Sequence, residues 1–461
     1  METSLSPTRN ELLAQIQQLQ AIVEQQQEMI ALLLKQIEKL KAEIERLKGG
    51  GKTKTPPPDW VKANTKKPEP PPQKTPRKQR KHSFVRLREA PTEEVVHACS
   101  ECPDCGRTLT GGSVRSQRQI LELPDIALRV IEHLFVERYC GVCKKRCTSK
   151  GDLSEQAVGQ SRFGPRVHAL VAYLRFVGRL PVSAITSLLS SFCRLKVSKG
   201  EVIALLSTVA TQGANAYEAL RTRLTESSYV HGDETGWREG GQNGYLWSFC
   251  TPDACYFTYP KTRAGHVVTD VLGEKYQGIV VSDFYGGYNR HNGLHQRCWV
   301  HLLRDVHKLK EQFPTQGVLD WCQQLRNLYD RAKAFSSPFV KERRRVRRRF
   351  QRELNALASP FVGTNLPQST LCKRLLGFEG ELFTFVEHPE VPSENNFAER
   401  AIRPRVIARK ISGGTRSEAG STMMVVLSSL FATWQLRKEE CLEACLKMLR
   451  QAQKSSLPHP A

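Results

Sequence analysis

A seven-residue repeat of apolar side chains runs through the first part of the sequence. One set is Ile16, Val23, Ile30, Ile37 and Ile44, and the other is Leu12, Leu19, Gln26, Leu33, Leu40 and Leu47. β-Branched residues at one seam position and leucine at the other favour a parallel two-stranded coiled coil. A single amphipathic helix packed on its own protein would not need so strict a 3.5-residue period. We therefore predict a coiled coil over residues 10–48, through which the chain self-associates.

The 461-residue chain carries a large excess of positive charge. Lys and Arg number 69 against 46 Asp and Glu, which gives a formal net charge of +23. This excess favours polyanionic partners, first of all nucleic acid, because its binding neutralises phosphates. An anionic membrane surface is the rival partner, but no stretch approaches roughly 18 consecutive apolar residues, so no membrane span is predicted.

Cysteine usage and the N-terminus indicate the compartment. The N-terminus lacks the charged-then-apolar layout of a secretory signal. Without such a signal, the 14 cysteines fit reduced thiols, some of them metal ligands, better than a disulfide framework. We therefore expect a cytoplasmic protein of roughly three domains.

Residues 49–92 are rich in Pro and in basic residues. Gly51 to Ala90 contains twelve Lys or Arg, three acidic residues and eight Pro. This composition cannot bury enough apolar surface to offset the entropy of ordering, so it predicts a flexible, extended linker. Its cluster from Arg77 to Lys81 either binds DNA backbone or is a solvated charge run.

Two C-x-x-C pairs predict a small zinc module over residues 93–150. The four sulfur ligands are Cys102, Cys105, Cys140 and Cys143, with Cys99 and Cys147 as substitutes. Each pair supplies two thiolates from one tight turn, and four thiolates leave no open position, so the zinc would be structural. The alternative is four unrelated buried thiols.

Residues 151–224 have helical periodicity. Val182 to Phe192 and Gly200 to Ala210 form two short helical patterns, and Ser198 is placed to cap the second. They form either a helix-turn-helix that binds DNA or an ordinary helical hairpin.

Short β-rich stretches begin after residue 225. Strands are expected over Tyr229–Asp233, Tyr245–Cys250 and Cys255–Tyr259, followed by a helix over Ala264–Leu272 and a buried strand over Ile279–Asp283. This order resembles the ribonuclease-H-like core, an α/β fold in which the first and fourth strands lie side by side. We therefore predict an α/β core from residues 225–303 and 386–415, in which Asp233 and Asp283 come together.

Asp233 and Asp283 are the first candidate catalytic residues. Two carboxylates at neighbouring strand ends repel each other, so burying them without a cation is costly. Two Mg²⁺ ions, or Mn²⁺ in their place, would resolve this, because hard cations take oxygen ligands. Such a pair activates the attacking oxygen and stabilises the leaving one. The alternative is that both aspartates only cap turns.

A third acidic ligand is expected on a helix further along the chain. Ser393 suits an N-cap, which places Glu394 at the first helical position and Glu399 in the second turn. Glu399 is favoured as the metal ligand because an internal helical position is the better fixed one, and Glu394 is the runner-up. In the alternative reading, Glu394 serves only the helix dipole and Glu399 only a surface ion pair with Arg400.

Basic residues crowd two further stretches. The first contains Arg400, Arg403, Arg405, Arg409 and Lys410, of which we assign Arg400, Arg403, Arg409 and Lys410 to DNA binding. The second lies in a predicted helical insertion over residues 304–385, where residues 341–349 hold seven basic residues in nine. This run either clamps DNA or keeps the chain soluble. A helical region over residues 416–461 completes the chain.

His295, Cys298 and His301 follow the second aspartate at intervals of three residues, which places them near one helical face. We expect Cys298 and His301 to support the core by packing against the active site, and His301 to help orient a scissile phosphate. The alternative is a transition-metal site.

Together these motifs resemble the transposases of the insertion sequence 66 family. The resemblance is carried by residues 231–237 (HGDETGW), 282–288 (SDFYGGY), 298–301 (CWVH), 395–404 (NNFAERAIRP) and the pair Arg409-Lys410. It implies a ribonuclease-H-like domain with an acidic triad of Asp233, Asp283 and Glu399, and dependence on Mg²⁺. Glu394 departs from the Asp that is usual in the family, which keeps the choice between the two glutamates open.

The resemblance also implies the partners and the reaction. The implied partners are the terminal inverted repeats of the element, target DNA and accessory proteins of the same element. The implied location is the nucleoid of a bacterial cell. We therefore predict a DNA transposase that cleaves and transfers strands. The alternatives are a DNA-binding regulator with an inert ribonuclease-H-like domain and a structure-specific nuclease that never rejoins ends.

Overall fold

The computed structural model describes residues 88–456 apart from residues 124, 125, 127, 149, 150, 152 and 154, together with the isolated helical residues 20, 27, 34, 38 and 41. Apart from those five positions, the predicted coiled coil over residues 10–48 lies outside the described residues, as does the predicted linker up to residue 87. Both stay predictions. The chain divides into two units, Met1–Leu121 and Glu122–Ala461, each considered by itself.

A mixed five-stranded sheet lies at the centre of the second unit. Its strands, in the spatial order β5-β4-β3-β6-β7, are β3 (Tyr229–Glu239), β4 (Gln242–Cys250), β5 (Cys255–Thr258), β6 (Ile279–Ser282) and β7 (His295–Arg297). β4 is antiparallel to β3 and β5, whereas β6 is parallel to β3 and β7. The predicted meander and the pairing of its first strand with the fourth are confirmed. This mixed α/β core is consistent with a ribonuclease-H-like domain.

Burial explains why β6 forms where it does. Its sequence Ile-Val-Val-Ser is buried at all four positions, as expected for a parallel strand that is covered on both faces. The helix α6 (His266–Leu272) and the short 3₁₀ helix η1 (Gly286–Arg290) lie before and after it. The chain therefore leaves β6 at Asp283 from a fixed, buried strand.

The edge strand β5 is covered by a helix. α14 (Glu418–Leu436) places Ser429 and Thr433 one turn apart, and their hydroxyls accept hydrogen bonds from the backbone N–H groups of Phe257 (2.8 Å) and Cys255 (3.0 Å). These hydroxyls satisfy strand donors that would otherwise be open at the sheet edge.

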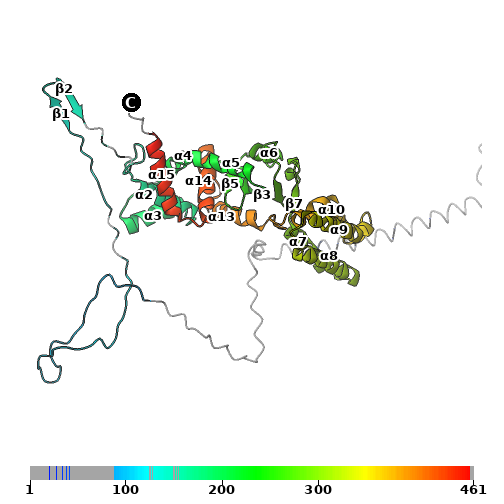
Figure 1. The fold of residues 1–461 in the computed structure, drawn as a ribbon, viewed down its shortest axis with the longest axis horizontal. Coiled ribbons are helices and arrows are strands. Elements are labelled where there is room, and N and C mark those ends of the chain that lie inside the picture. The colour runs from blue at the N-terminus through cyan, green and yellow to red at the C-terminus, as the bar shows by residue number, and fades with distance from the viewer. Residues whose placement is uncertain are drawn as a thin grey trace, which may run out of the picture. The chain divides into compact units, whose positions relative to one another are not determined.

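Helices form a bundle on one side of the sheet (Figure 1). They are α2 (Pro165–Phe176), α3 (Val182–Cys193), α4 (Lys199–Gln212), α5 (Ala214–Glu226), α14 and α15 (Cys441–Ser456). The predicted cap of α4 is confirmed, because Ser198 Oγ accepts from Glu201 N (3.1 Å) and Glu201 accepts in return from Ser198 N (2.8 Å). This reciprocal pair is a capping box.

A second helical group has its own core. Its helices are α7 (Trp299–Gln312), α8 (Gln316–Ala334), α9 (Val340–Ala358), η2 (Ser359–Phe361), α10 (Ser369–Gly377), α11 (Glu379–Leu382) and α12 (Thr384–Glu387). Trp299, Trp321, Phe350 and Phe383 are among its buried residues. The helices predicted between the fourth strand, β6, and the Glu399 segment are thus present, and the strand β7 before them was not predicted (Figure 1).

A short hairpin and one further helix complete the described elements. β1 (Glu137–Cys140) and β2 (Lys145–Thr148) form an antiparallel hairpin, and α13 (Asn396–Ser412) packs on β3. No helix within the described residues is long and apolar enough to cross a membrane.

Candidate active site

Asp233 and Asp283 lie at the same level of the sheet. The parallel pairing of β3 with β6 ends at His231 opposite Val281, so two further residues along each strand lead to the two aspartates. β3 continues to Glu239, and Asp233 therefore lies within a strand rather than at its end as the sequence predicted. After Asp233 the chain continues into a β-hairpin with β4, and the pairing with β4 fixes the backbone of Asp233.

Each aspartate uses one carboxylate oxygen within the protein. Asp233 Oδ1 accepts from Glu234 N (3.0 Å), and Asp283 Oδ1 accepts from Tyr285 N (2.9 Å). Among the described residues, no hydrogen bond involves the second oxygen of either side chain. The turn-capping alternative is thus partly correct for Asp283, and it leaves an oxygen on each residue for a ligand.

The electrostatics of Asp233 link the acidic residues to one another. Burial, followed by the charges of Glu234, Asp283 and Glu399, raises the pKa of Asp233 to about 8. These three carboxylates come from β3, the end of β6 and helix α13. The structure thus brings Asp283 and Glu399 into the neighbourhood of Asp233, as expected for three ligands of shared cations.

Glu399 lies in the first turn of α13, because that helix starts at Asn396 with Asn395 as its N-cap. The predicted N-cap at Ser393 is wrong: Ser393 is buried and its hydroxyl pairs with that of Tyr329 (3.1 Å). Glu399 Oε1 is a buried atom without a hydrogen-bond partner. Glu394 lies before the helix and lines a separate cavity of about 210 Å³ with His231 and Arg400.

Asn395 joins the elements that carry these carboxylates. Its side-chain Nδ2 donates to the carbonyl of Gly232 (2.6 Å), and its Oδ1 lies 2.9 Å from His231 Nδ1. Its backbone N donates to Cys298 Sγ (3.1 Å). Asn395 is 1% exposed, so these bonds are made away from water and fix the start of α13 against β3 and α7.

Glu234 is an acidic residue that the sequence analysis did not assign. Its side chain is 3% exposed and pairs with Arg263 Nη2 (2.6 Å), while its second oxygen accepts from the Tyr288 hydroxyl (2.8 Å). Burial raises its pKa. Gly232 leaves room for this contact, because a Cβ there would meet the Tyr288 ring at 2.5 Å. Its position next to Asp233 was the signal in the sequence that could have identified Glu234. Because side chains alternate along a strand, Glu234 points to the opposite face of β3 from Asp233.

Arg297 on β7 holds the loop that carries Asp283. Its guanidinium is fully buried and donates to the Asp283 carbonyl (2.9 Å) and to Ser282 Oγ (3.1 Å). It also forms an ion pair with Glu381 of α11 (2.5 Å). A buried arginine with these partners ties the end of β6 to the helical insertion.

Comparison with known proteins identifies the family. Residues 160–423, which are more than half of the chain, match the sequence profile of a protein family described as "Transposase IS66 family". This chain belongs to the IS66 family of transposases. The matched residues contain the whole five-stranded sheet, the helical insertion and α13, and the resemblance predicted from the motifs is confirmed.

One curated relative of this IS66-family chain is a protein of Sinorhizobium fredii described as uncharacterized protein y4jO. It is 30% identical over 156 residues, which are 34% of this chain and 47% of that protein. The chain therefore spans about half the length of the relative that it matches.

Cys298, His301 and Glu399 form a compact group of ligand atoms. One such atom from each residue lies within 4.8 Å of the others, and His301 Nδ1 is 3.6 Å from Glu399 Oε1. Cys298 is the N-cap of α7, and burial raises the pKa of its thiol. The predicted helical face of three residues is wrong for His295, which lies on β7. Cys298 and His301 thus lie beside Glu399, and their supporting role stays a prediction. The mixed ligand types also suit a transition metal.

The predicted zinc ligands lie in two units, Cys102 and Cys105 in the first and Cys140 and Cys143 in the second. Each pair forms a tight turn, in which Gly106 N donates to the Cys102 carbonyl (2.8 Å) and Cys143 N donates to Cys140 Sγ (3.4 Å). Backbone hydrogen bonds lower the pKa of Cys102 and of Cys140, which favours thiolates. The four-cysteine zinc site stays a prediction.

The basic residues of α13 divide into two kinds. Arg400, Arg403 and Lys410 are exposed, as DNA binding requires. Arg409 instead donates to the Gly236 carbonyl and to Thr235 Oγ1 on β3. Arg405 is buried against Phe176 and donates to Ser428 Oγ (3.0 Å), so its charge is directed into the protein.

Proposed function

We propose that this chain is a DNA transposase that cleaves and joins strands with divalent cations held by Asp233, Asp283 and Glu399. The observation that carries the proposal is that β3, the end of β6 and α13 bring three carboxylates together. Burial and these neighbouring carboxylates raise the pKa of Asp233. Such a group is stabilised by bound cations. Membership of the IS66 transposase family supports the same reaction.

The available donor atoms fit hard cations. Asp233 and Asp283 each have one oxygen without a hydrogen bond among the described residues. Glu399 Oε1 is buried without a hydrogen-bond partner, with His301 Nδ1 3.6 Å away. Mg²⁺ and Mn²⁺ both suit such carboxylate sites. When bound, two such ions would activate the attacking oxygen and stabilise the leaving oxygen of an in-line displacement.

The protein's own residues would prepare this site. Asn395 fixes the start of the helix that carries Glu399, and Arg297 fixes the loop that carries Asp283. Exposed Arg400 and Arg403 would hold phosphates nearby. Water would then cleave a phosphodiester to leave a 3′-hydroxyl and a 5′-phosphate. That hydroxyl would attack a phosphodiester of target DNA, forming a new phosphodiester as the target's own P–O3′ bond breaks and its 3′-hydroxyl leaves.

We propose further that the zinc module and the helices before residue 224 bind the terminal inverted repeats, and that the coiled coil associates two or more copies. Accessory proteins of the element could join this assembly. These roles rest on the motif resemblance, the net charge of +23 and the heptad repeat.

A cleavage assay tests the proposal. The substrate is a duplex that contains the inverted repeat flanking the gene, with Mg²⁺ or Mn²⁺. Asp233→Asn, Asp283→Asn and Glu399→Gln should abolish cleavage but retain duplex binding, whereas Glu394→Gln, the matched control, should retain both. Full cleavage by either aspartate variant would refute the assignment. Tight binding without cleavage by the unaltered protein would indicate a regulator, and cleavage without strand transfer would indicate a nuclease.

A further inference from the structure

Helix α9 carries the densest positive charge of the described residues, and its packing decides which side chains face outward. Val346, Phe350, Leu354 and Ala358 recur every four residues and are buried in the core of the helical insertion. This apolar stripe fixes the rotation of α9 about its axis. The basic residues at the intervening positions are therefore held in fixed directions.

Some of these arginines are used within the protein. Arg344 and Arg347 each form an ion pair with Glu387 (2.7 Å), and Arg343 donates to the Glu387 carbonyl (2.8 Å). Arg349 lies 3.6 Å from Glu353. The charges of these arginines are therefore balanced by partners within the protein, and no external ligand is needed to explain them.

The other basic residues form what we call the open stripe: Lys341, Arg345, Arg348 and Arg352. All four are exposed, and among the described residues none forms an ion pair. Arg352 makes one long hydrogen bond, from its Nε to the Arg348 carbonyl (3.4 Å). Their spacing of four, three and four residues places them on one helical face. Four neighbouring cations without acidic partners repel one another, and an anion would relieve that repulsion.

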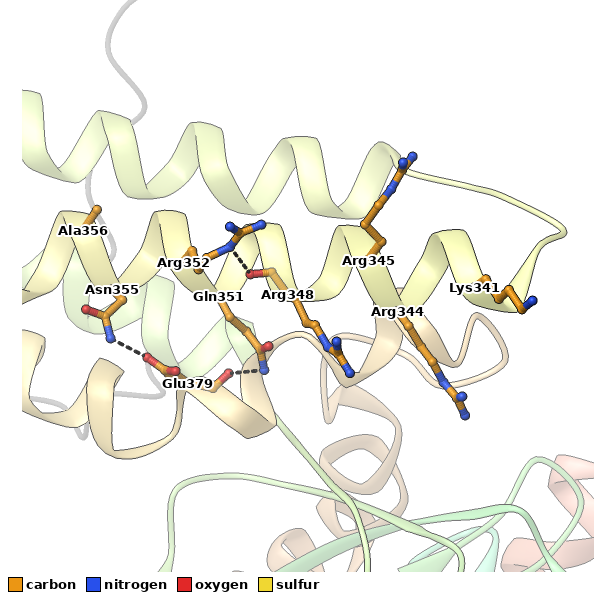
Figure 2. Close-up of a pocket in the computed structure, with 9 residues that line it drawn as sticks. All are labelled: Lys341, Arg344, Arg345, Arg348, Gln351, Arg352, Asn355, Ala356 and Glu379. Carbon is orange, nitrogen blue, oxygen red and sulfur yellow. Dashed lines mark hydrogen bonds between the residues drawn. The ribbon is translucent and has the colours of Figure 1, made fainter.

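The open stripe borders a groove of about 920 Å³ (Figure 2). Arg344, Gln351, Asn355 and Glu379 complete the polar part of its lining. Glu379, the acid among these lining residues, is bonded at its carboxylate by Asn355 (2.9 Å). Figure 2 shows the basic side chains following one another along α9, with Asn355 beyond them on that helix and Glu379 beside it on α11. Five of the nine lining residues are therefore cationic and one is acidic.

We propose that the open stripe is a binding site for the phosphodiester backbone of duplex DNA, an inference that rests on the proposed function. Guanidinium groups bind phosphates in a bidentate manner. From Lys341 to Arg352 the helix rises by eleven residue steps, about 16 Å, which equals the length of about five base-pair steps. No aromatic side chain lines the groove, which disfavours stacking of single-stranded bases. The contact would therefore be to backbone, without sequence preference.

Salt dependence of binding tests this site in the full chain. The probe is a fluorescent duplex of arbitrary sequence, and its affinity is measured by anisotropy over a series of KCl concentrations. The triple variant Arg345→Ala, Arg348→Ala, Arg352→Ala should weaken binding at least about tenfold near physiological salt. The slope of log K against log[salt] should fall by about 2 to 3, since each lost phosphate contact removes about 0.9.

A matched control separates local contacts from net charge. Arg326→Ala, Arg331→Ala, Arg349→Ala removes the same charge from arginines that are paired with Asp330 or Glu353, and its slope should change by less than about 1. The triple variant Arg345→Lys, Arg348→Lys, Arg352→Lys should keep the wild-type slope of log K against log[salt]. Equal losses in both Ala triples, or an unchanged slope in the stripe variant, would overturn the proposal. So would equal loss of binding to polyglutamate and to duplex, which would indicate a general polyanion surface.

Failure of the proposed function has a different signature. Asp233→Asn should remove cleavage and leave the salt slope unchanged, whereas the stripe variant should change the slope and still cleave duplex at saturating protein. Circular dichroism melting of each variant checks folding, and the exposed positions predict unchanged melting temperatures.

Discussion

The side-chain amide of Asn395 donates a 2.6 Å hydrogen bond to the carbonyl of Gly232. Asn395 is the N-cap of the helix that carries Glu399, and Gly232 directly precedes Asp233 on β3. One hydrogen bond therefore couples the backbones of two acidic residues that are more than 160 positions apart in the sequence. Because both partners are buried, the bond is shielded from competing water.

Asn395→Ala should reduce DNA cleavage by at least about tenfold and destabilise the fold by about 1–3 kcal/mol, since it leaves a buried carbonyl without its donor. The metal requirement should also shift to higher Mg²⁺ concentration, because Glu399 would be less well placed. Asn396→Ala at the next position is the control. Urea denaturation and a Mg²⁺ titration of cleavage measure both effects, and an unchanged Mg²⁺ requirement would argue against positioning by Asn395.

Asp233 should make the cation-free protein sensitive to pH. Burial and neighbouring carboxylates raise its pKa from the ordinary 3.8 to about 8 in the folded state. Its contribution to stability is thus fully present below about pH 4 and is lost as pH rises toward 8. In EDTA, Asp233→Asn should gain stability relative to wild type by about 2–4 kcal/mol between pH 5 and pH 8. Urea midpoints test this. An equal difference in stability between variant and wild type at pH 5 and pH 8 would contradict it. Adding Mg²⁺ should restore the stability of the wild type at pH 8.

Arg297→Met should destabilise the protein by about 3 kcal/mol or more, because it strands buried acceptors around Asp283 and removes the partner of Glu381. Arg374→Met is the control, since Arg374 pairs with Asp305 where both side chains are about a third exposed. That variant should cost less than about 1 kcal/mol. Thermal melting compares the two, and equal losses would show that Arg297 has no special structural role.

Thr433→Val should destabilise the sheet edge by about 1–3 kcal/mol, because the Cys255 N–H would lose its acceptor in a buried setting. Thr433→Ser keeps the hydroxyl and should lose much less. Hydrogen exchange at the Cys255 amide is the direct readout. Protection that survives in the Val variant would show that α14 shields this strand by packing alone.

Local patterns predicted much of the catalytic core. Short β-rich stretches marked the strands of the meander, and the apolar run at residues 279–282 marked the buried strand. Ser198 identified the start of α4, because an N-cap side chain acts within the first turn of its helix. The neighbouring positions of Asp233 and Asp283 followed from strand order.

The start of α13 could not be predicted in the same way. Ser393 has a good intrinsic preference for an N-cap, but its hydroxyl is used by Tyr329 of the helical insertion, and the helix begins three residues later. The burial of Glu234 by Arg263 and Tyr288 was missed for a similar reason. In both cases the deciding partner lies far along the chain.

By itself, the sequence determined the β-rich and helical segments, the carriage of Asp233 and Asp283 by neighbouring strand segments, and the family motifs. The tertiary structure alone decided which polar side chains are consumed inside the fold. Arg347 and Arg348 are adjacent and chemically identical, yet one is paired with Glu387 and the other is exposed on the open stripe. The physical reason is that backbone periodicity is set by near neighbours, whereas the partner of a charge is set by whatever side chain packing brings within about 4 Å.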